Sequence, residues 1–375
     1  MSHFIQLHLL TSYPPSNLNR DDLGQPKTAR LGGVERLRIS SQSLKRAWRT
    51  SEVFQQQLAG TIGTRTKALG LEAVYKPLIN AGCTEKQATE WATQIAQVYG
   101  KLKTEKGKML EIEQLVHISP EERQTLDTLV ATLVQERRAP SKEELDSLLQ
   151  DQAAVDIAMF GRMLTDGKGG KGDSDQEDGK KNKVEPKKRQ QFIKEAAVQV
   201  AHAIGVHASP IEDDYFTAVD DLNNDDSGAG HVGESGFAQA LFYQYICIDR
   251  EQLKKNLGGD EAPDAAEALT QRAIHALAEA ALKVGPTGKQ NSYASRAYAH
   301  FALAEKGNQQ PRSLTLAVLK PIAGEDYAAD AVAALLKVQA NMDQVYGACA
   351  DERASFNVFS GEGSADALLN FVAAE

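Results

Sequence analysis

The chain has 375 residues and carries 42 Lys and Arg against 51 Asp and Glu, which gives a formal net charge of −9. Domains usually hold about 100–200 residues, so the length predicts two or three structural units with ample core. No stretch approaches the roughly 20 apolar residues that a membrane-spanning helix needs, which excludes an integral membrane protein.

The N-terminus and the cysteines indicate a cytoplasmic protein. The first residues lack the basic and apolar regions of a signal peptide. Cys83, Cys247 and Cys349 lie far apart and form no CxxC pair. This usage is typical of a reducing compartment and disfavours a disulfide scaffold or a structural zinc site. We therefore expect a cytoplasmic location and neither a metal nor another cofactor.

The charges are strongly segregated along the chain. Residues 20–49 hold eight basic residues against three acidic ones, and residues 180–194 hold seven against one. Residues 212–226 hold seven acidic residues and no basic one. An acidic chain with this distribution can still present a basic groove to nucleic acid, although its net charge alone would disfavour one.

The first elements mix strand and helix patterns. Residues 4–10 alternate, which predicts a half-buried strand with Ile5, Leu7 and Leu9 on the buried face. A loop rich in proline and glycine follows, and residues 36–39 are typical of a short strand. A helix should begin at the serines of residues 40–43 and turn Trp48 inward.

Residues 51–150 change to a helical pattern. Capping boxes begin at Thr84, Ser119 and Ser141, and Pro120 stands at the first position of its helix. Apolar residues between these starts recur at helical spacing. We predict a helical insertion.

Strand-like patterns return after residue 153. Residues 155–160 resemble a strand, and residues 166–191 are charged and glycine-rich, which predicts a flexible basic loop. The later predicted elements are strands at 201–206 and 241–248, a protruding hairpin from 215–219 and 228–236, a helix at 264–281, strands at 298–303 and 314–319, and a helix at 328–339. The absence of a regular βαβ repeat favours an α+β fold with an antiparallel sheet.

A search for catalytic motifs finds little. Asp21 and Asp22 could hold a metal ion for phosphodiester hydrolysis, or could cap backbone N–H groups of their own loop. Two GxGxxG matches, at 167–172 and 228–233, lack the strand and helix that a dinucleotide site requires. The sequence contains no HExxH, GxxxxGK[ST] or GxSxG motif.

Polar and basic residues gather at the predicted helix start. Ser40 and Gln42 offer hydrogen-bond donors, while Lys45 and Arg49 share one helix face at i, i+4. Helix N-termini bind phosphate readily, so this set predicts a phosphate site, with a solvated helix face as the plainer alternative. Residues 289–293 follow a glycine- and proline-containing turn and form a second polar, basic loop.

Longer motifs resemble those of a known family. The matching runs, in chain order, are Leu18 to Asp22, Gly32-Gly33, Arg38 to Ala47, Asp156-Ile157-Ala158, Gly161-Arg162-Met163, Ala201 to Ile204, Phe216 to Leu222, His231-Val232-Gly233, Lys289-Gln290 and Tyr293-Ala294. Together they resemble the backbone subunit of the type I-E CRISPR Cascade complex, CasC of the "Cas seven" family. The likeness is loose in the helical insertion and toward the C-terminus.

The resemblance implies a fold and its boundaries. It implies an α+β protein with an RRM-like (ferredoxin-like) antiparallel sheet as the palm, an inserted helical domain and a protruding β-hairpin thumb. The palm would comprise 1–50, 151–204 and 241–375, the helical domain 51–150, and the thumb 205–240.

The resemblance also implies a non-catalytic function. Copies of the subunit would polymerise head to tail along CRISPR RNA and present it to target DNA, beside other Cascade subunits and a recruited helicase-nuclease. The RNA-binding positions carried over are Arg20, Ser40, Gln42, Lys45, Arg46, Arg49, Arg162, Met163, Phe216, Thr217, Val232, Lys289 and Gln290. Met163 would wedge beside the RNA, and Phe216, Thr217 and Val232 would flip and cap a nucleotide. Arg49 stands where we expect lysine, which keeps the charge but changes the donor geometry.

Two rival functions stay open. Related backbone subunits of other CRISPR types cut RNA with a loop aspartate, so Asp21 or Asp22 could make the chain a metal-dependent RNase that cuts guide-paired RNA. The chain could instead be a protein-only scaffold whose basic loops contact acidic partners. Metal-dependent cleavage would favour the first rival, and a lack of co-purifying RNA would favour the second.

Overall fold

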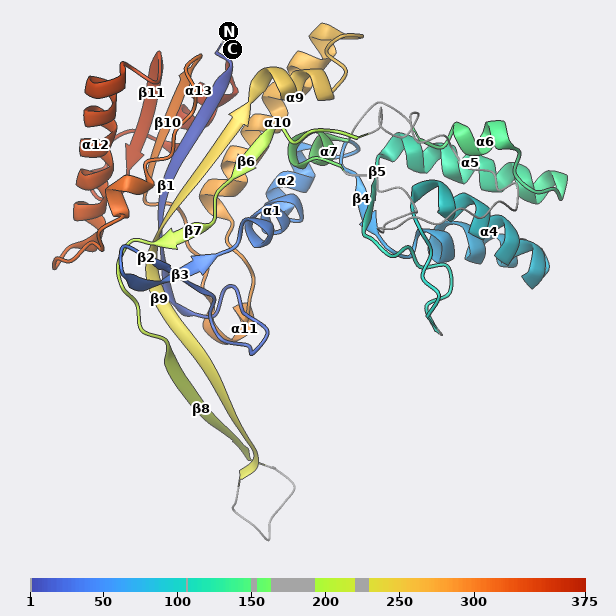
Figure 1. The fold of residues 1–375 in the computed structure, drawn as a ribbon, viewed down its shortest axis with the longest axis horizontal. Coiled ribbons are helices and arrows are strands. Elements are labelled where there is room, and N and C mark those ends of the chain that lie inside the picture. The colour runs from blue at the N-terminus through green and yellow to red at the C-terminus, as the bar shows by residue number, and fades with distance from the viewer. Residues whose placement is uncertain (1, 106, 150–153, 163–192, 220–228) are drawn as a thin grey trace, which may run out of the picture. The chain divides into compact units, whose positions relative to one another are not determined.

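The computed structural model describes residues 2–105, 107–149, 154–162, 193–219 and 229–375 (Figure 1). The chain divides into two units, of which unit 1 comprises Met1–Gln57, Val198–Glu251 and Thr270–Glu375. Unit 2 comprises Leu58–Ala197 and Gln252–Leu269. The later boundaries fall inside two helices, α9 (Arg250–Asn256) and α10 (Pro263–Lys283). Within the described residues, no helix is both long and apolar enough to cross a membrane.

A nine-stranded sheet organises unit 1, and its strand pairs are antiparallel. Its main path runs β11-β10-β1-β9-β7-β3-β2, and β6 and β8 also pair with β9. The strands are β1 (Phe4–Ser16), β2 (Thr28–Leu31), β3 (Val34–Ile39), β6 (Val198–Val200), β7 (Ala203–Gly205), β8 (Glu212–Val219), β9 (Ala229–Asp249), β10 (Phe301–Gly307) and β11 (Glu352–Asn357). The predicted α+β class with an antiparallel sheet is confirmed.

Strand β1 lies between β9 and β10 and is buried on both faces. Ile5, Leu7 and Leu9 are fully buried, as predicted, but Gln6 and His8 on the other face are buried as well. The prediction of a half-buried strand is therefore wrong. The second face is covered by α12 (Tyr327–Tyr346) and the 3-10 turn η2 (Thr315–Val318), which share a hydrophobic cluster with β1.

Helices cover both faces of this sheet (Figure 1). On one face, Leu10 and Leu303 pack with Leu335 of α12. Lys306 points to the opposite face of β10, since side chains alternate along a strand. Its Nζ donates to Ala374 O at 2.7 Å, at the end of α13 (Ala365–Ala373). Both faces of the sheet therefore form core.

Two predicted strands need correction. The strand expected at 298–303 is β10 and begins at Phe301. The strand expected at 314–319 is instead the turn η2, whose end is held by buried Arg36. Arg36 Nη2 donates to the carbonyl oxygens of Val318 and Leu319, both at 3.2 Å, so these groups are satisfied without a sheet partner. The helices predicted at 264–281 and 328–339 are confirmed as α10 and α12.

A two-stranded ribbon projects from the sheet (Figure 1). Strand β9 is 21 residues long, and from Ala238 onward it pairs with β1. Its earlier part, up to Phe237, pairs with β8. This confirms the predicted hairpin.

Unit 2 is mainly helical. Its elements are β4 (Thr64–Thr66), the π-helix η1 (Gly70–Tyr75), α3 (Lys76–Asn80), α4 (Glu85–Tyr99), β5 (Val116–Ile118), α5 (Pro120–Glu136), α6 (Lys142–Asp146) and α7 (Val155–Phe160). The capping boxes at Thr84, Ser119 and Ser141 are all present. Unit 2 continues to Ala197 and includes 252–269, so it is larger than the helical segment expected at 51–150.

The strand predicted at 155–160 is wrong, because these residues form α7. Val155 to Met159 are all buried, so the apparent alternation does not separate a core face from a solvent face. The polar residue that suggested alternation, Asp156, is buried and accepts a hydrogen bond from Gly63 N at 2.8 Å. The loop predicted at 166–191 lies outside the described residues.

Candidate nucleic-acid interface

Helix α1 (Ser41–Arg49) presents one side to the core and the rest to solvent. Ser40 is its N-cap, and Ser40 Oγ accepts a hydrogen bond from Ser43 N at 3.3 Å. Leu44 and Trp48 are buried, as predicted. Trp48 Nε1 donates to Val284 O at 3.1 Å, which fixes α1 against the end of α10.

A cleft of 650 Å³ runs along one side of α1. Three segments of unit 1 form it: the loop after β1, the exposed side of α1, and the loop after α10. Its lining includes Arg20, Asp21, Asp22, Ser43, Arg46 and Thr287.

Hydrogen bonds and close packing hold the cleft walls together. Asn17 Nδ2 donates to Gly236 O at 2.8 Å and ties the first loop to β9. Asn19 Oδ1 accepts from Ser40 N at 2.8 Å and ties the same loop to the start of α1. At Gly288 a β-carbon would lie 2.4 Å from a carbonyl oxygen of the first loop, so the two loops touch backbone to backbone. The cleft is therefore built on a rigid frame.

The cations of the cleft are Arg20 and Arg46, and both are exposed. Within the part of the chain that the structure describes, neither guanidinium forms an ion pair with a carboxylate. Two unpaired cations facing one cleft favour an anionic ligand such as a phosphate.

The paired aspartates of the cleft differ in their contacts. Asp21 Oδ1 accepts hydrogen bonds from two backbone N–H groups of its own loop, each at 2.9 Å, which confirms the capping alternative for this residue. Asp22 is exposed. Among the described residues, no group of three or more His, Cys, Asp and Glu side chains is arranged to hold a metal ion.

Helical geometry separates the predicted phosphate contacts of α1 into two sets. Each residue advances about 100° around a helix, so Lys45 and Arg49 lie roughly 130° away from the side that lines the cleft. Both side chains are partly exposed, and burial lowers the pKa of Lys45. Gln42 is exposed on the side between the two sets. The cleft thus brings Arg46 together with Arg20, and leaves Lys45 and Arg49 on a different side of the helix.

The second predicted basic loop lies at the base of the β8–β9 ribbon. Lys289 Nζ contacts Ser235 Oγ of β9, and the Lys289 backbone is left-handed, with φ of 46°. Gln290 begins the short helix α11 (Gln290–Tyr293) and accepts from Ser295 Oγ at 3.5 Å. These two residues follow the loop that closes the cleft.

The predicted cap residues lie on the ribbon and are exposed. Phe216 is 45% exposed and Val232 is 49% exposed. Thr217 and Val232 are cross-strand partners, and Phe216 pairs with Gly233. A β-carbon at Gly233 would lie 2.3 Å from the Phe216 ring, so the ring covers the glycine backbone. The ribbon therefore presents apolar groups that do not belong to a core.

Arg162 does not fit the predicted RNA contact. It is buried in unit 2, where its Nη1 lies 2.8 and 2.9 Å from the two carboxylate oxygens of buried Glu122. Glu122 is also the capping-box residue of α5, so the ion pair stabilises the start of that helix. A buried and paired guanidinium is not placed to contact a phosphate, and we correct this prediction. Met163 lies outside the described residues.

One group of basic residues was missed by the sequence analysis. Lys27, Arg38 and His202 come together near β3 and β7, and Arg38 Nη1 donates to His202 Nδ1 at 2.8 Å. Their positions are far apart in sequence and depend on strand register. The basic window at 20–49 contains Lys27 and Arg38, and the motif runs contain Arg38 and His202, but neither signal indicates that the three are neighbours.

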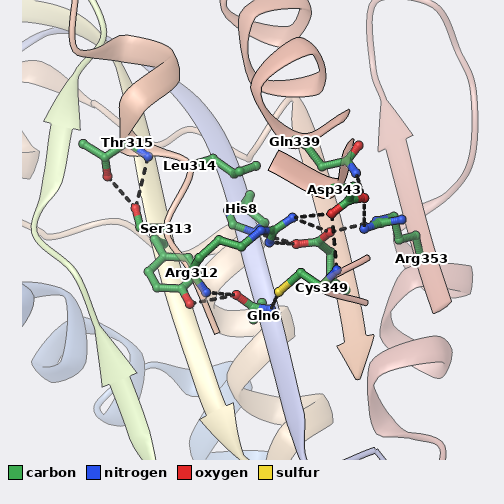
Figure 2. Close-up of polar contacts among 12 residues, drawn as sticks. Gln6, His8, Arg312, Ser313, Leu314, Thr315, Gln339, Asp343, Cys349 and Arg353 are labelled. Carbon is green, nitrogen blue, oxygen red and sulfur yellow. Dashed lines mark hydrogen bonds and ion pairs between the residues drawn. The ribbon is translucent and has the colours of Figure 1, made fainter. Parts of the chain in front are cut away.

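A second polar cluster is buried on the α12 face of the sheet (Figure 2). Glu305 of β10 is fully buried and contacts His8 Nε2 at 3.1 Å, Arg353 Nε at 2.8 Å and the Arg312 guanidinium. Arg353 Nη2 also contacts Asp343 of α12 at 2.6 Å. The cluster joins three strands to one helix and is closed to a macromolecular ligand.

The contacts of His8 place a proton on one of its ring nitrogens. Glu305 ionised only accepts, so His8 Nε2 carries the proton that faces it. Tyr243 OH accepts from Leu314 N at 3.0 Å and lies 2.9 Å from His8 Nδ1. Burial lowers the pKa of His8. Burial alone would raise the pKa of Glu305, but hydrogen bonds from His8, Arg312 and Arg353 bring it well below its usual range.

Comparisons with known proteins cover nearly the whole chain. A family model described as CT1975-like protein matches residues 5–176 and 187–369. A chain from a structure described as "CRISPR RNA-guided surveillance complex, pre-nicking" is 27% identical, with a TM-score of 0.78 and coverage of 99% of both chains. Another, from a "CRISPR RNA-guided surveillance complex", is 22% identical, with a TM-score of 0.69 and the same coverage, and it shows the fold alone. A comparison with curated protein sequences finds no match.

The residues matched by the family model include every motif on which the resemblance was based. None of these motifs lies in the unmatched segment at 177–186. The type I-E subtype stays a prediction. The chain belongs to the CT1975-like protein family, and the predicted resemblance to the "Cas seven" backbone subunits of CRISPR complexes is confirmed.

Proposed function

We propose that this protein is a non-catalytic backbone subunit of a CRISPR RNA-guided complex, and that it binds the phosphates of the guide RNA. The observation that carries the proposal is the cleft beside α1, where Arg20 and Arg46 are exposed and have no carboxylate partner among the described residues. RNA phosphates would pair with these two guanidinium groups, because the aspartates of the same cleft, Asp21 and Asp22, form no ion pair with them within the described residues. The 27% identical chain comes from a structure described as a CRISPR RNA-guided surveillance complex, which supports this class of ligand.

The chemistry of the cleft suits RNA of any sequence. Guanidinium contacts to phosphate fix the position of a strand but do not read its bases. The bases of the guide would stay free to pair with target DNA, which is how RNA-guided complexes read sequence. The proposed RNA path continues beyond the cleft to six further residues, Ser40, Gln42, Lys45, Arg49, Lys289 and Gln290.

The β8–β9 ribbon is proposed as the thumb of the RRM-like palm. Its exposed Phe216 and Val232, with Thr217 beside them, would cap a displaced nucleotide between neighbouring copies. Its acidic residues, among them Glu212 and Asp213, suit a head-to-tail filament, in which each copy meets the next through two different and complementary surfaces. Other Cascade subunits, target DNA, the recruited helicase-nuclease and the type I-E subtype complete this proposal.

RNA binding by the full chain tests the central claim. Two single-stranded RNAs of unrelated sequence should bind with the same affinity, and that affinity should fall steeply as salt rises. A matched pair of measurements with single-stranded DNA tests the preference for RNA. Sequence-selective or salt-independent binding would contradict a phosphate surface.

The RNase alternative has its own test. Asp21 Oδ1 already accepts hydrogen bonds from two backbone N–H groups, so Asp22 is the aspartate to replace. We expect no Mg²⁺-dependent cleavage of RNA paired to a bound guide, either by the wild type or by Asp22→Asn. Cleavage by the wild type that disappears in Asp22→Asn would establish the RNase and overturn the non-catalytic proposal.

A further inference from the structure

Three basic side chains meet on one side of the unit 1 sheet. Lys27 lies directly opposite Arg38, since Arg38 N donates to Lys27 O at 2.8 Å where the β2–β3 ladder begins. His202 precedes β7 and lies diagonally across from Arg38 in the β3–β7 register. Arg38 Nη1 donates to His202 Nδ1 at 2.8 Å, and Arg38 Nε donates to Thr28 O at 3.3 Å, so the guanidinium is held in place.

This arrangement is unfavourable for the chain alone. Like charges on directly opposite residues of an antiparallel pair destabilise a sheet. No carboxylate within the described ranges forms an ion pair with Lys27 or Arg38. The acid on the same strand, Glu35, accepts from Thr28 Oγ1 at 2.5 Å and lies opposite Arg30. An anion from outside the chain would relieve the repulsion.

The contact with Arg38 also decides which proton His202 carries. An arginine only donates, so His202 Nδ1 must be the acceptor and neutral His202 carries its proton on Nε2. His202 is exposed, and this N–H is a third donor beside the two cations. Lys27 and Arg38 also line a small recess that reaches Asn19, a residue of the cleft wall.

We propose that Lys27, Arg38 and His202 form a binding site for one phosphodiester group of RNA. The inference rests on the proposed function and extends the RNA path across the loop that separates this site from the cleft. Lys27 N donates to Asn19 O at 2.8 Å, so the same loop residue supports both sites. Lys27 and Arg38 would supply charge, and His202 would supply a directed N–H group.

The site predicts a coupling between RNA binding and protonation. Burial, followed by the charges of Arg38 on β3 and Lys27 before β2, lowers the pKa of His202. Among the described residues, no charged group of the neighbouring strand β9 and no carboxylate contributes to this shift. A bound phosphate offsets the two positive charges and raises the pKa of His202. RNA should therefore bind more tightly as pH falls, by about tenfold for each unit by which binding raises that pKa.

The experiment follows the ¹³C-labelled histidine rings of the full chain by NMR from pH 5 to 8, alone and with a saturating single-stranded RNA. Loss of one signal in His202→Gln assigns the residue. We expect RNA to raise the pKa of His202, and RNA affinity to increase from pH 7.5 to pH 5.5. The increase should disappear in His202→Gln and remain in His275→Gln, a partly exposed histidine on α10 that contacts Gln57 rather than a cation.

A second variant and a second probe keep the result decisive. Lys27→Gln removes a cation that forms no ion pair within the described residues. It should lower the slope of log RNA affinity against log salt by about 0.7. If RNA binds while the pKa of His202 and the pH dependence of affinity stay unchanged, the site is wrong and the proposed function stands. If RNA does not bind at any pH, the proposed function fails. The phosphate site is then tested by adding inorganic phosphate instead of RNA and measuring the pKa of His202. A rise in the pKa of His202 with phosphate supports an anion site, and no change overturns it.

Discussion

Replacing Arg20 and Arg46 together by glutamine should weaken RNA binding most at low salt. Both guanidiniums are exposed in the cleft, so each can neutralise one phosphate. For single strands, each lost contact lowers the slope of log affinity against log salt by about 0.7, and two contacts lower it by about 1.4. Between 50 and 200 mM salt, wild-type affinity should therefore fall about sevenfold more than that of the double variant.

The assay is a fluorescence-anisotropy titration of one labelled single-stranded RNA at four or more salt concentrations. A matched control is Lys320→Gln with Lys337→Gln, which removes the same charge from exposed positions beside η2 and on α12. The control should keep the wild-type slope, because long-range effects of net charge are screened at these salt concentrations.

Two outcomes would refute the assignment of the cleft. One is a cleft variant whose slope equals that of the wild type. The other is a control whose slope falls as far as that of the cleft variant, because net charge rather than position would then govern binding. Replacement by glutamine keeps most of the side-chain volume, so a loss of binding cannot be ascribed to a collapsed cleft wall.

Three further expectations follow from the structure. Lys45→Gln with Arg49→Gln should lower the salt slope by a further 1.4 or so if RNA continues around α1, and a loss confined to one of two unrelated RNAs would contradict phosphate contacts. Glu305→Gln should destabilise unit 1 by about 3 kcal/mol, because it leaves buried hydrogen-bonding groups without a charged partner, and Arg312 and Arg353 then share Asp343 alone as a carboxylate partner among the described residues. Fluorescence of Trp48 in a Trp91→Phe background reports this unit alone, and the control Lys337→Gln, at an exposed position of α12 in the same unit, should cost less than about 0.5 kcal/mol. The folded-state pKa of Glu305 lies below the unfolded value of about 4.3. The contribution of Glu305 to the stability of unit 1 is therefore fully present above pH 4.3 and is lost as pH falls through the folded-state pKa. A wild-type acid transition no steeper than that of Glu305→Gln would refute this expectation. Phe216→Ala with Val232→Ala should leave unit 1 stability within about 0.5 kcal/mol of wild type, since both residues are surface positions, yet disrupt the regular spacing of guide nucleotides protected in assembled complexes. A periodic footprint that survives would show that these residues are not nucleotide caps.

Local signals in the sequence predicted local structure well. The capping boxes at Thr84, Ser119 and Ser141 identify three helix starts, because each depends on residues within one turn. The segment at 155–160 was mistaken for a strand, because six residues do not distinguish a short buried helix from a strand. The burial of Gln6 and His8 could not be predicted either, since their partners lie some 300 residues away.

In the candidate site, too, the sequence indicated individual residues but not which of them are neighbours in the fold. The sequence identified Arg20 and Arg46 as cations of interest, and the fold decides that they face one cleft while Lys45 and Arg49 do not. Arg162 matched a motif, but its buried partner Glu122 lies 40 residues away and removes it from the surface. Lys27, Arg38 and His202 become neighbours only through strand register, which a single sequence does not specify at this distance.

Strand β9 carries two very different environments on one uninterrupted backbone. Ala238, Ala240 and Ile246 are buried in the middle of the sheet, whereas Val232 lies in a two-stranded ribbon without a core. Amide hydrogen exchange along this strand should therefore range from rapid local opening in the ribbon to exchange limited by global unfolding in the sheet. A partner that orders the ribbon would slow exchange in the first part of the strand and leave the second part unchanged. The protein thus contains its own reference amides for detecting assembly, within a single strand.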